Sequence, residues 1–373
     1  IKKTKYMNKH FWALLSFLVV SSVSTAQEKK EKFLNELKQE IKNEKIPGCG
    51  IVVIKNGQTV LSEFFGLSDY AFSVSTDSST IFSINSLSKI FAGTAVMQLV
   101  EDGKIKLSNP ISDYLDDLPN TWKGITIRQL LSHTSGLPDI EDIQNGGLIG
   151  GKGEKIAWEK VKNEKIRFKA GESFDYIQTN YVLILKLIEK VSGMTYLKFL
   201  QKNQFDKIGI NKEIIFGSSF ESIQNKSSTY SYYEKNKQTG QYEKGERLFE
   251  ISEDFSPLVW ADAGAFATTN ALTKWVKALK NDMFITSKSR KEMWTAVPLN
   301  DGQYGGFGGF LNGYGYGWPV IMRENHPAVA PIGGGRASLI IYPDDELTII
   351  LLTNLTGSSP QKIIEKVAHH YWE

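Results

Sequence analysis

Cysteine is almost absent from this 373-residue chain, which contains a single one, Cys49. One cysteine cannot form an internal disulfide, and a zinc site built from several thiolates is excluded as well. Cys49 stands between two glycines ahead of an apolar run, a setting typical of a small buried residue. The chain must be stabilised by its core, and it is long enough for one large core or for two domains.

Several signatures of catalysis and binding are also missing. There is no H-E-x-x-H zinc motif and no G-x-S-x-G nucleophile elbow. The glycine-rich stretch 304–318 neither follows a strand nor opens a helix, so it is a poor phosphate loop. We expect no metal or organic cofactor, because the histidines that follow residue 26 show no metal-ligand spacing; they are His133, His326, His369 and His370. The adjacent pair His369–His370 is interpreted as a helix end.

Residues 1–26 have the pattern of a leader. Met7 to His10 form a basic region, an apolar run covers 11–20, and the small residues 24–26 resemble a cleavage site. We interpret 1–6 as extra sequence upstream of the true start. The apolar run is too short to span a membrane, and no cysteine at the cleavage site offers a lipid anchor. The pattern predicts an exported protein, periplasmic or secreted, with no stable membrane anchor.

The balance of basic and acidic residues indicates which classes of binding partner to expect. The whole chain has a formal net charge of +3, but residues 1–26 hold four of its 44 basic residues and none of its 41 acidic ones. The remainder therefore has a net charge of −1, which gives no reason to expect nucleic acid or an anionic membrane as a partner. We expect a small-molecule or peptide substrate, and the oligomeric state stays open.

The order of patterns along the chain predicts an α/β fold with an insertion. An amphipathic helix near residues 33–41 precedes two apolar runs around Asn56-Gly57, a strong hairpin signal. Two further strand-like runs lie near the end, at 336–343 and 346–354. We expect these four strands to form one antiparallel sheet flanked by helices. Residues 27–100 and 255–373 would form this α/β domain, and 101–254 a mainly helical inserted subdomain, with a site in the cleft between them.

A serine and a lysine three residues apart, Ser86 and Lys89, form the most informative motif. Such residues share one helix face, so the lysine amine can reach the serine hydroxyl and accept its proton. A helix N-terminus would favour the developing alkoxide. A second copy, Ser359–Lys362, starts with Ser-Pro and is interpreted as a helix start. Tyr176, just before an apolar helix, is a candidate proton carrier, because a nearby lysine cation favours the ionised phenol; the alternative is a core aromatic residue.

Longer segments carry a resemblance to a known family. Four segments resemble the serine β-lactamase-related family: FSINSLSK (82–89), LLSHTSGLPD (130–139), GESFDYIQTNYVLILKLIEKVSG (171–193) and ADAGAFATTNALTKW (261–275). That family contains class C β-lactamases, D-alanyl-D-alanine carboxypeptidases and related esterases. The resemblance implies a β-lactamase/transpeptidase-like fold with an all-helical subdomain, an acyl-enzyme mechanism and a structural role for His133.

Two positions depart from the family pattern. Gln178 stands where the family has Asn, two residues after the tyrosine, and its longer side chain changes substrate positioning. The third family motif, normally Lys or His, a small residue and Gly, is matched by PIGGGR (331–336). We expect Gly334 or Gly335 to join the N–H of Ser86 in an oxyanion hole. Arg336 could replace the missing cation and bind a substrate carboxylate, or face solvent; His326 is a weaker substitute.

The sequence therefore predicts an exported serine hydrolase that cleaves an ester or amide bond through an acyl-enzyme. Ser86 would be the nucleophile, Lys89 its base and Tyr176 the proton carrier. The missing third-motif cation favours an esterase or a D-amino-acid-type peptidase over a true β-lactamase, since a substrate carboxylate is usually held by a cation. A catalytically weak module that binds penicillin or cell-wall fragments is the alternative from another class.

Overall fold

The computed structural model describes residues 27–142, 147–151, 153–236 and 238–372. The predicted leader, residues 1–26, lies outside this part of the chain. No helix within the described ranges is long and apolar enough to cross a membrane.

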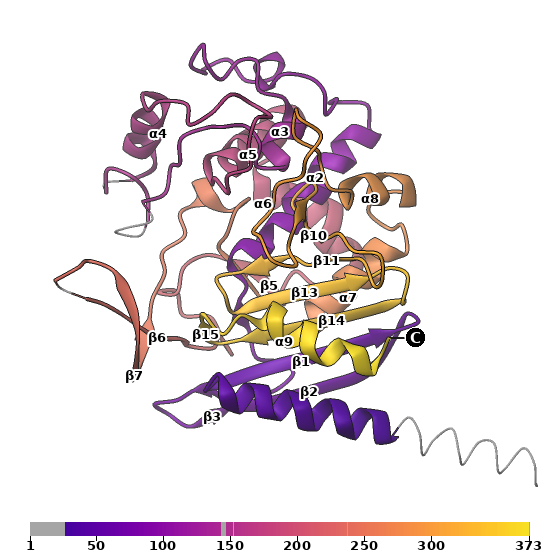
Figure 1. Ribbon diagram of the computed structural model, residues 1–373. Coiled ribbons are helices and arrows are strands. Elements are labelled where there is room, and N and C mark those ends of the chain that lie inside the picture. Colours follow the sequence, from indigo (N-terminus) through magenta and orange to yellow (C-terminus); the bar gives the residue numbers. More distant parts are fainter. Residues whose placement is uncertain (1–26, 143–146, 152, 237, 373) are drawn as a thin grey trace, which may run out of the picture.

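An antiparallel nine-stranded sheet forms the centre of the molecule (Figure 1). Its order is β3-β2-β1-β14-β13-β11-β10-β9, and β12 pairs with β13 beside this path. The strands are β1 Gly48–Lys55, β2 Gln58–Asp69, β3 Val74–Ser75, β9 Gly313–Tyr314, β10 Pro319–Ile321, β11 Ala328–Val329, β12 Ile332–Gly333, β13 Ala337–Tyr342 and β14 Leu347–Thr353.

The two predicted hairpins meet at the middle of this sheet. Asn56 and Gly57 both have positive φ, 51° and 73°, as a two-residue turn between twisted strands requires. β1 pairs with β14 along its length, from Cys49 opposite Thr353 to Lys55 opposite Leu347. The N-terminal hairpin and the C-terminal strands therefore lie side by side, and the prediction that they form one antiparallel sheet is confirmed.

Both faces of the sheet are buried, each under its own helices. The N-terminal helix (27–43) and α9 (Pro360–Val367) cover one face, while α7 (Thr269–Lys280) lies on the other (Figure 1). Alternation along β1 matches this arrangement, because side chains of successive residues point to opposite faces. Ile51 and Val53 pack in the core beneath the N-terminal helix and α9, and Val52 and Ile54 pack in the core on the other face.

Residues 101–254 combine short helices with strands. They contain α3 Ile127–Leu131, α4 Glu154–Lys162, α5 Thr179–Ser192 and α6 Tyr196–Leu200. The same segment also provides three strands: β5 Ile214–Phe216, β6 Thr229–Lys235 and β7 Tyr242–Ile251. The hairpin β6–β7 pairs with β15 (Leu355–Thr356), and β5 pairs with β8 (Ala265–Ala267), which also bonds β4 (Phe82–Ser83). These strands connect the segment to both ends of the α/β part.

Candidate active site

Ser86 lies in a tight turn at the point where strand β4 leads into helix α2 (Lys89–Glu101). The turn, η1 (Asn85–Ser88), is a 3-10 helix, so Ser86 precedes the α-helix instead of occupying its first turn as expected. Asn85 has a φ of 47°, in the left-handed region that few residues other than glycine adopt. Its conformation is held by the hydroxyl of Ser88, which donates to Asn85 O at 2.6 Å. The side chain of Ser86 itself is half-buried.

Lys89 is buried beside the turn, and its amine has several partners. The residue is 1% exposed. Nζ donates to Gln178 Oε1 at 3.0 Å and forms an ion pair with the Asp262 carboxylate. It also lies 4.5 Å from the centre of the Tyr176 ring, within cation–π range. Within the described ranges, no hydrogen bond joins Lys89 to Ser86, so the amine is directed to Asp262 and Gln178 rather than to the nucleophile.

Burial lowers the pKa of Lys89 from its usual 10.5 to about 7, because the desolvated cation is disfavoured. The carboxylates of Glu141 and Asp139 act in the opposite direction and favour the charged amine. The contact with Asp262 favours the cation as well. The amine is therefore placed where a proton can leave or return near neutral pH, which a solvent-exposed lysine could not do.

Tyr176 meets the same amine from the helical side of the site. Its half-buried ring lies 4.3 Å from the ring of His133 and 4.9 Å from that of Phe307. Burial raises the pKa of Tyr176 well above its usual range, and a hydrogen bond from Ser86 only partly offsets this. The direction of this shift is opposite to the one expected from a lysine cation, because desolvation disfavours the phenolate, and the role of Tyr176 as proton carrier stays a prediction. Tyr176 is a neutral phenol that contacts Ser86.

Gln178 and His133 hold the segment that carries Tyr176. Gln178 orients the Lys89 amine through Oε1, while its backbone N–H donates to Asp139 Oδ1 at 3.1 Å. His133 is fully buried and accepts from the backbone N–H of Ile177 at 3.1 Å through Nδ1. Burial lowers the pKa of His133 well below its usual value, so the ring is a neutral acceptor. This supports the interpretation of His133 as a structural residue.

The glycine segment lies against the nucleophile turn, where Gly334 is one of the two residues expected to form the oxyanion hole. β12 packs on η1, and a β-carbon at Gly333 would lie 1.9 Å from Ile84 O. Only glycine permits this approach of two backbones. Gly334, with a φ of 56°, is next to the Asn85 amide, whereas Gly335 packs against Gly357. Gly333 and Gly334 are thus closer to the turn than Gly335.

The position of Arg336 differs from both predictions, a contact with a substrate carboxylate and exposure to solvent. It is 1% exposed, so it neither faces solvent nor extends into the cleft. Its guanidinium forms an ion pair with Glu253 and donates from Nη1 to Thr356 Oγ1 at 2.6 Å. Glu253 in turn accepts from the Asn85 amide at 3.2 Å. A buried cation requires a partner of opposite charge, and Glu253 provides it. Arg336 therefore supports the nucleophile turn through Glu253, and its guanidinium is not available to bind a substrate carboxylate.

A cavity of about 680 Å³ opens in front of Ser86. Among the described residues, the charged side chains that line it are acidic: Glu141, Glu154, Glu253, Asp254 and Asp262. Two of these are paired with buried cations, Glu253 with Arg336 and Asp262 with Lys89. Burial raises the pKa of Glu141 to about 7, and nearby Asp139 adds to the rise. Among the described side chains that line the cleft, none offers a substrate a free cation.

The remaining sequence candidates lie elsewhere. Ser359 stands at the start of α9 with Pro360 following, so the second S-x-x-K copy is a helix start, as predicted. The Nδ1 atom of His326 lies within hydrogen-bond distance of Asp345 Oδ1, at 2.8 Å, and the imidazole ring stacks on Trp372. Cys49 is fully buried, as predicted, and burial raises the pKa of its thiol to about 12. Asp262 and Glu253 were not identified from the sequence, since no local spacing connects them to Lys89 or Arg336.

Comparison with known proteins identifies the group to which this arrangement belongs. The family model of the Beta-lactamase family matches residues 33–370. The chain belongs to the Beta-lactamase family. Similar members include penicillin-binding protein 4* of Bacillus subtilis, 27% identical over 92% of this chain and 76% of that protein. Protein flp of Staphylococcus aureus is 24% identical over 86% of this chain, which spans only 62% of flp.

Solved structures show the same fold. The octameric penicillin-binding protein homologue from Pyrococcus abyssi superposes with a TM-score of 0.73 at 24% identity, covering 89% of this chain and 75% of that one. The penicillin-binding protein from Bacillus halodurans gives a TM-score of 0.69 at 20% identity, covering 89% of this chain and 98% of that one. At these identities the likeness establishes the fold, and the prediction of a mixed α/β, β-lactamase-like architecture is confirmed.

Proposed function

We propose that this member of the Beta-lactamase family is a serine hydrolase that cleaves an ester or amide bond through an acyl-enzyme. The observation that carries the proposal is the convergence of Ser86, Lys89 and Tyr176. Tyr176 contacts both the Ser86 hydroxyl and the Lys89 amine, although it lies about 90 residues further along the chain. A nucleophile, a group that titrates near neutral pH and a neutral proton donor at one cavity are the components that acyl transfer needs.

The reaction would proceed in two steps. Ser86 Oγ attacks the carbonyl carbon while its proton passes to the neutral form of Lys89, and backbone N–H groups of Ser86 and the glycine segment stabilise the oxyanion. Tyr176 donates the phenolic proton to the leaving group and recovers one from Lys89. Water then adds to the acyl carbon, and Ser86 Oγ leaves with a proton. Asp262 would act on Lys89, because its carboxylate decides how readily the amine loses its proton.

The charge of the cleft bears on the substrate. Because Arg336 is paired with Glu253 and the lining side chains are acidic, a neutral or cationic ester or amide would be favoured over one with a carboxylate next to the scissile bond. This argues for an esterase or peptidase over a true β-lactamase. The alternative, a weakly catalytic penicillin-binding module, rests on a different observation: the Lys89 amine is paired with Asp262 and not with Ser86.

Covalent labelling tests the proposal. The chain would be incubated with a fluorophosphonate and, separately, with penicillin, and its intact mass followed over time. We expect a fluorophosphonate adduct that is lost in Ser86→Ala and kept in Ser359→Ala, the matched serine of the second S-x-x-K copy. A penicillin adduct that persists without turnover of neutral esters would favour the binding module. Equal labelling of wild type and Ser86→Ala would refute the assignment of the nucleophile.

Export is proposed on the leader pattern alone. The supporting feature is the basic, apolar and small-residue order of residues 7–26. N-terminal sequencing of the protein recovered outside the cytoplasm should give Gln27 as the first residue. A protein that keeps residues 7–26 and stays inside the cell would contradict the proposal.

A further inference from the structure

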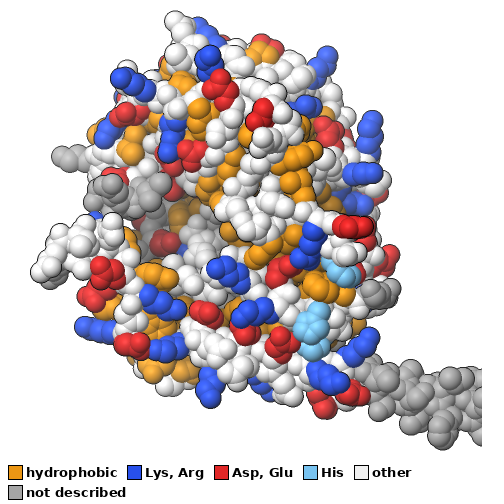
Figure 2. All heavy atoms as spheres, viewed as in Figure 1, with side chains coloured by type: hydrophobic (Ala, Val, Ile, Leu, Met, Phe, Trp, Pro, Cys, Tyr) orange, Lys and Arg blue, Asp and Glu red, His pale blue; other side chains and the backbone are white. Residues whose placement is uncertain are grey.

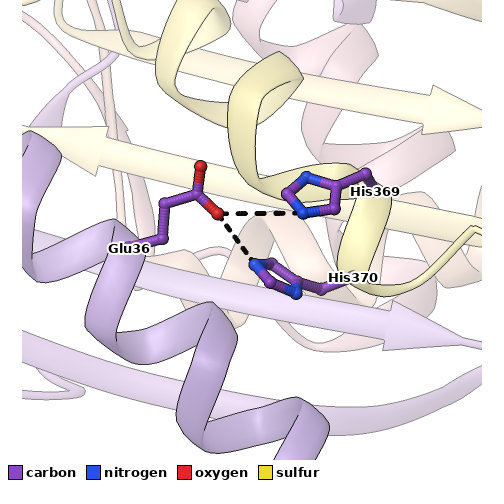
Figure 3. Close-up of side chains that lie close together, drawn as sticks. All are labelled: Glu36, His369 and His370. Carbon is purple, nitrogen blue, oxygen red and sulfur yellow. Dashed lines mark hydrogen bonds and ion pairs between the residues drawn. The ribbon is translucent and has the colours of Figure 1, made fainter.

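Three potential metal ligands meet where the N-terminal helix passes the end of the chain, on the face of the sheet that α9 covers. Glu36 comes from the helix 27–43, and His369 and His370 from the 3-10 turn η6 (Ala368–His370) that follows α9. Figure 3 shows both imidazole rings directed at one carboxylate. Figure 2 shows histidine side chains at the surface of this face, so the place is open to solvent. Ser86 belongs to the opposite face, so the catalytic proposal does not involve this cluster.

The spacing of the ligand atoms suits a single transition-metal ion. His370 Nε2 lies 2.8 Å and His369 Nε2 lies 3.9 Å from Glu36 Oε2, and all three ligand atoms lie within 4.8 Å of one another. Tetrahedral zinc, with bonds of about 2.0–2.1 Å, places its ligand atoms about 3.3 Å apart. The two distances to Glu36 bracket that value, so small side-chain rotations would complete the geometry.

Neighbouring groups fix the orientation of the His369 and His370 rings, and so decide which ring nitrogen lies towards Glu36. Nδ1 of His369 lies 2.7 Å from Lys366 O, which can only accept, so Nδ1 carries a proton and Nε2 is the ring nitrogen that lies towards Glu36. Metal-bound histidines typically donate their second N–H to a carbonyl or carboxylate in this way. The ring of His370 is fixed by an edge contact with Phe33, 6.2 Å between centres, from the same helix as Glu36. A plain hydrogen bond between Glu36 and His370 would not require His369 to be oriented.

We propose that Glu36, His369 and His370 form a binding site for one divalent transition-metal ion of the zinc class. Two imidazoles with one carboxylate favour zinc, copper or nickel, whereas calcium and magnesium prefer oxygen ligands throughout. The ion takes the place of the hydrogen that now joins His370 to Glu36, and water completes its coordination. Because Glu36 and the histidines are more than 330 residues apart, the ion cross-links the two ends of the described chain and stabilises the fold.

Zinc titration of the full chain, free of any histidine tag, tests this site. We expect isothermal titration to show saturable binding of one Zn²⁺ per chain, and no binding of Mg²⁺. Glu36→Gln and His369→Ala should each weaken Zn²⁺ binding at least about tenfold, the least expected when metal coordination is disturbed. Zn²⁺ should raise the Tm of the wild type and leave that of Glu36→Gln unchanged.

The matched control is Glu40→Gln, one helical turn further on. Glu40 forms an ion pair with Lys366 and is not among the three ligands, so its loss should change Zn²⁺ affinity less than about twofold. Absence of saturable binding to the wild type would overturn the proposal. So would Zn²⁺ binding of wild-type strength in either ligand variant. Neither result would affect the assignment of Ser86, which is tested by covalent labelling.

Discussion

Asp262→Asn tests how the site controls the charge of Lys89. The substitution keeps the shape of the side chain and removes the only charge that forms an ion pair with this amine within the described ranges. Burial sets the pKa of Lys89 near 7 against a usual 10.5, a gap that corresponds to about 5 kcal/mol. One pH unit below this pKa, at pH 6, the charged amine is favoured over the neutral form by about 1.4 kcal/mol, which limits what the loss of Asp262 can cost there.

The loss of stability should depend on pH, with a definite sign. A lysine whose folded pKa lies below its unfolded pKa destabilises the fold most below pH 7, and this penalty decreases as the pH rises towards 10.5. Asp262 offsets the penalty in the wild type. We therefore expect Asp262→Asn to lower the free energy of unfolding by about 1 kcal/mol at pH 6 and by clearly less at pH 9.

The same substitution should alter catalysis in a way that simple loss of stability would not. Without the carboxylate, Lys89 loses its proton more readily, by roughly the 1.5–3 kcal/mol of a charge-assisted contact. The acid limb of the pH profile of kcat/KM should then shift down by about one to two pH units.

Urea unfolding at both pH values and kcat/KM profiles on a neutral ester would measure these two effects. Asp254→Asn is the control, because Asp254 lines the same cavity but is exposed. An equal effect of both substitutions, or an acid limb that does not move, would refute the reasoning.

Three further substitutions test the rest of the site. Tyr176→Phe should slow acyl transfer by about two to four orders of magnitude with an unchanged Tm, because it removes one positioned proton carrier; single-turnover rates near wild type would contradict this. Arg336→Ala should lower the free energy of unfolding by about 1–3 kcal/mol in urea, since it removes the cation that pairs with half-buried Glu253, and a neutral result would mean that this pair is dispensable. Gly333→Ala should reduce kcat/KM at least about a hundredfold, because the new methyl group would displace the backbone before the nucleophile turn. Gly124→Ala, where a β-carbon meets nothing within 4 Å, should be silent, and equal effects at the two glycines would contradict the role of Gly333.

Features of the fold that depend on neighbouring residues could be predicted from the sequence. The Asn56-Gly57 turn forms because both residues accept positive φ, and the apolar runs on either side of it define the two strands that it joins. The start of α9 at Ser359-Pro360 is decided in the same local way. The pairing of β1 with β14 could also be expected, since apolar strands of this kind must find partners within one sheet.

The chemistry of the candidate site was decided by residues far apart in the sequence. The spacing of Ser86 and Lys89 identified the motif, but not that the amine is directed at Asp262, 173 residues later. Arg336 was recognised as a cation, but its burial against Glu253 follows from the packing of β12 and β13 on the nucleophile turn. A sequence motif specifies which groups are near each other along one turn. Burial and charge depend on every segment that packs around those groups, and they set the protonation of Lys89 and Tyr176 only once the chain is folded.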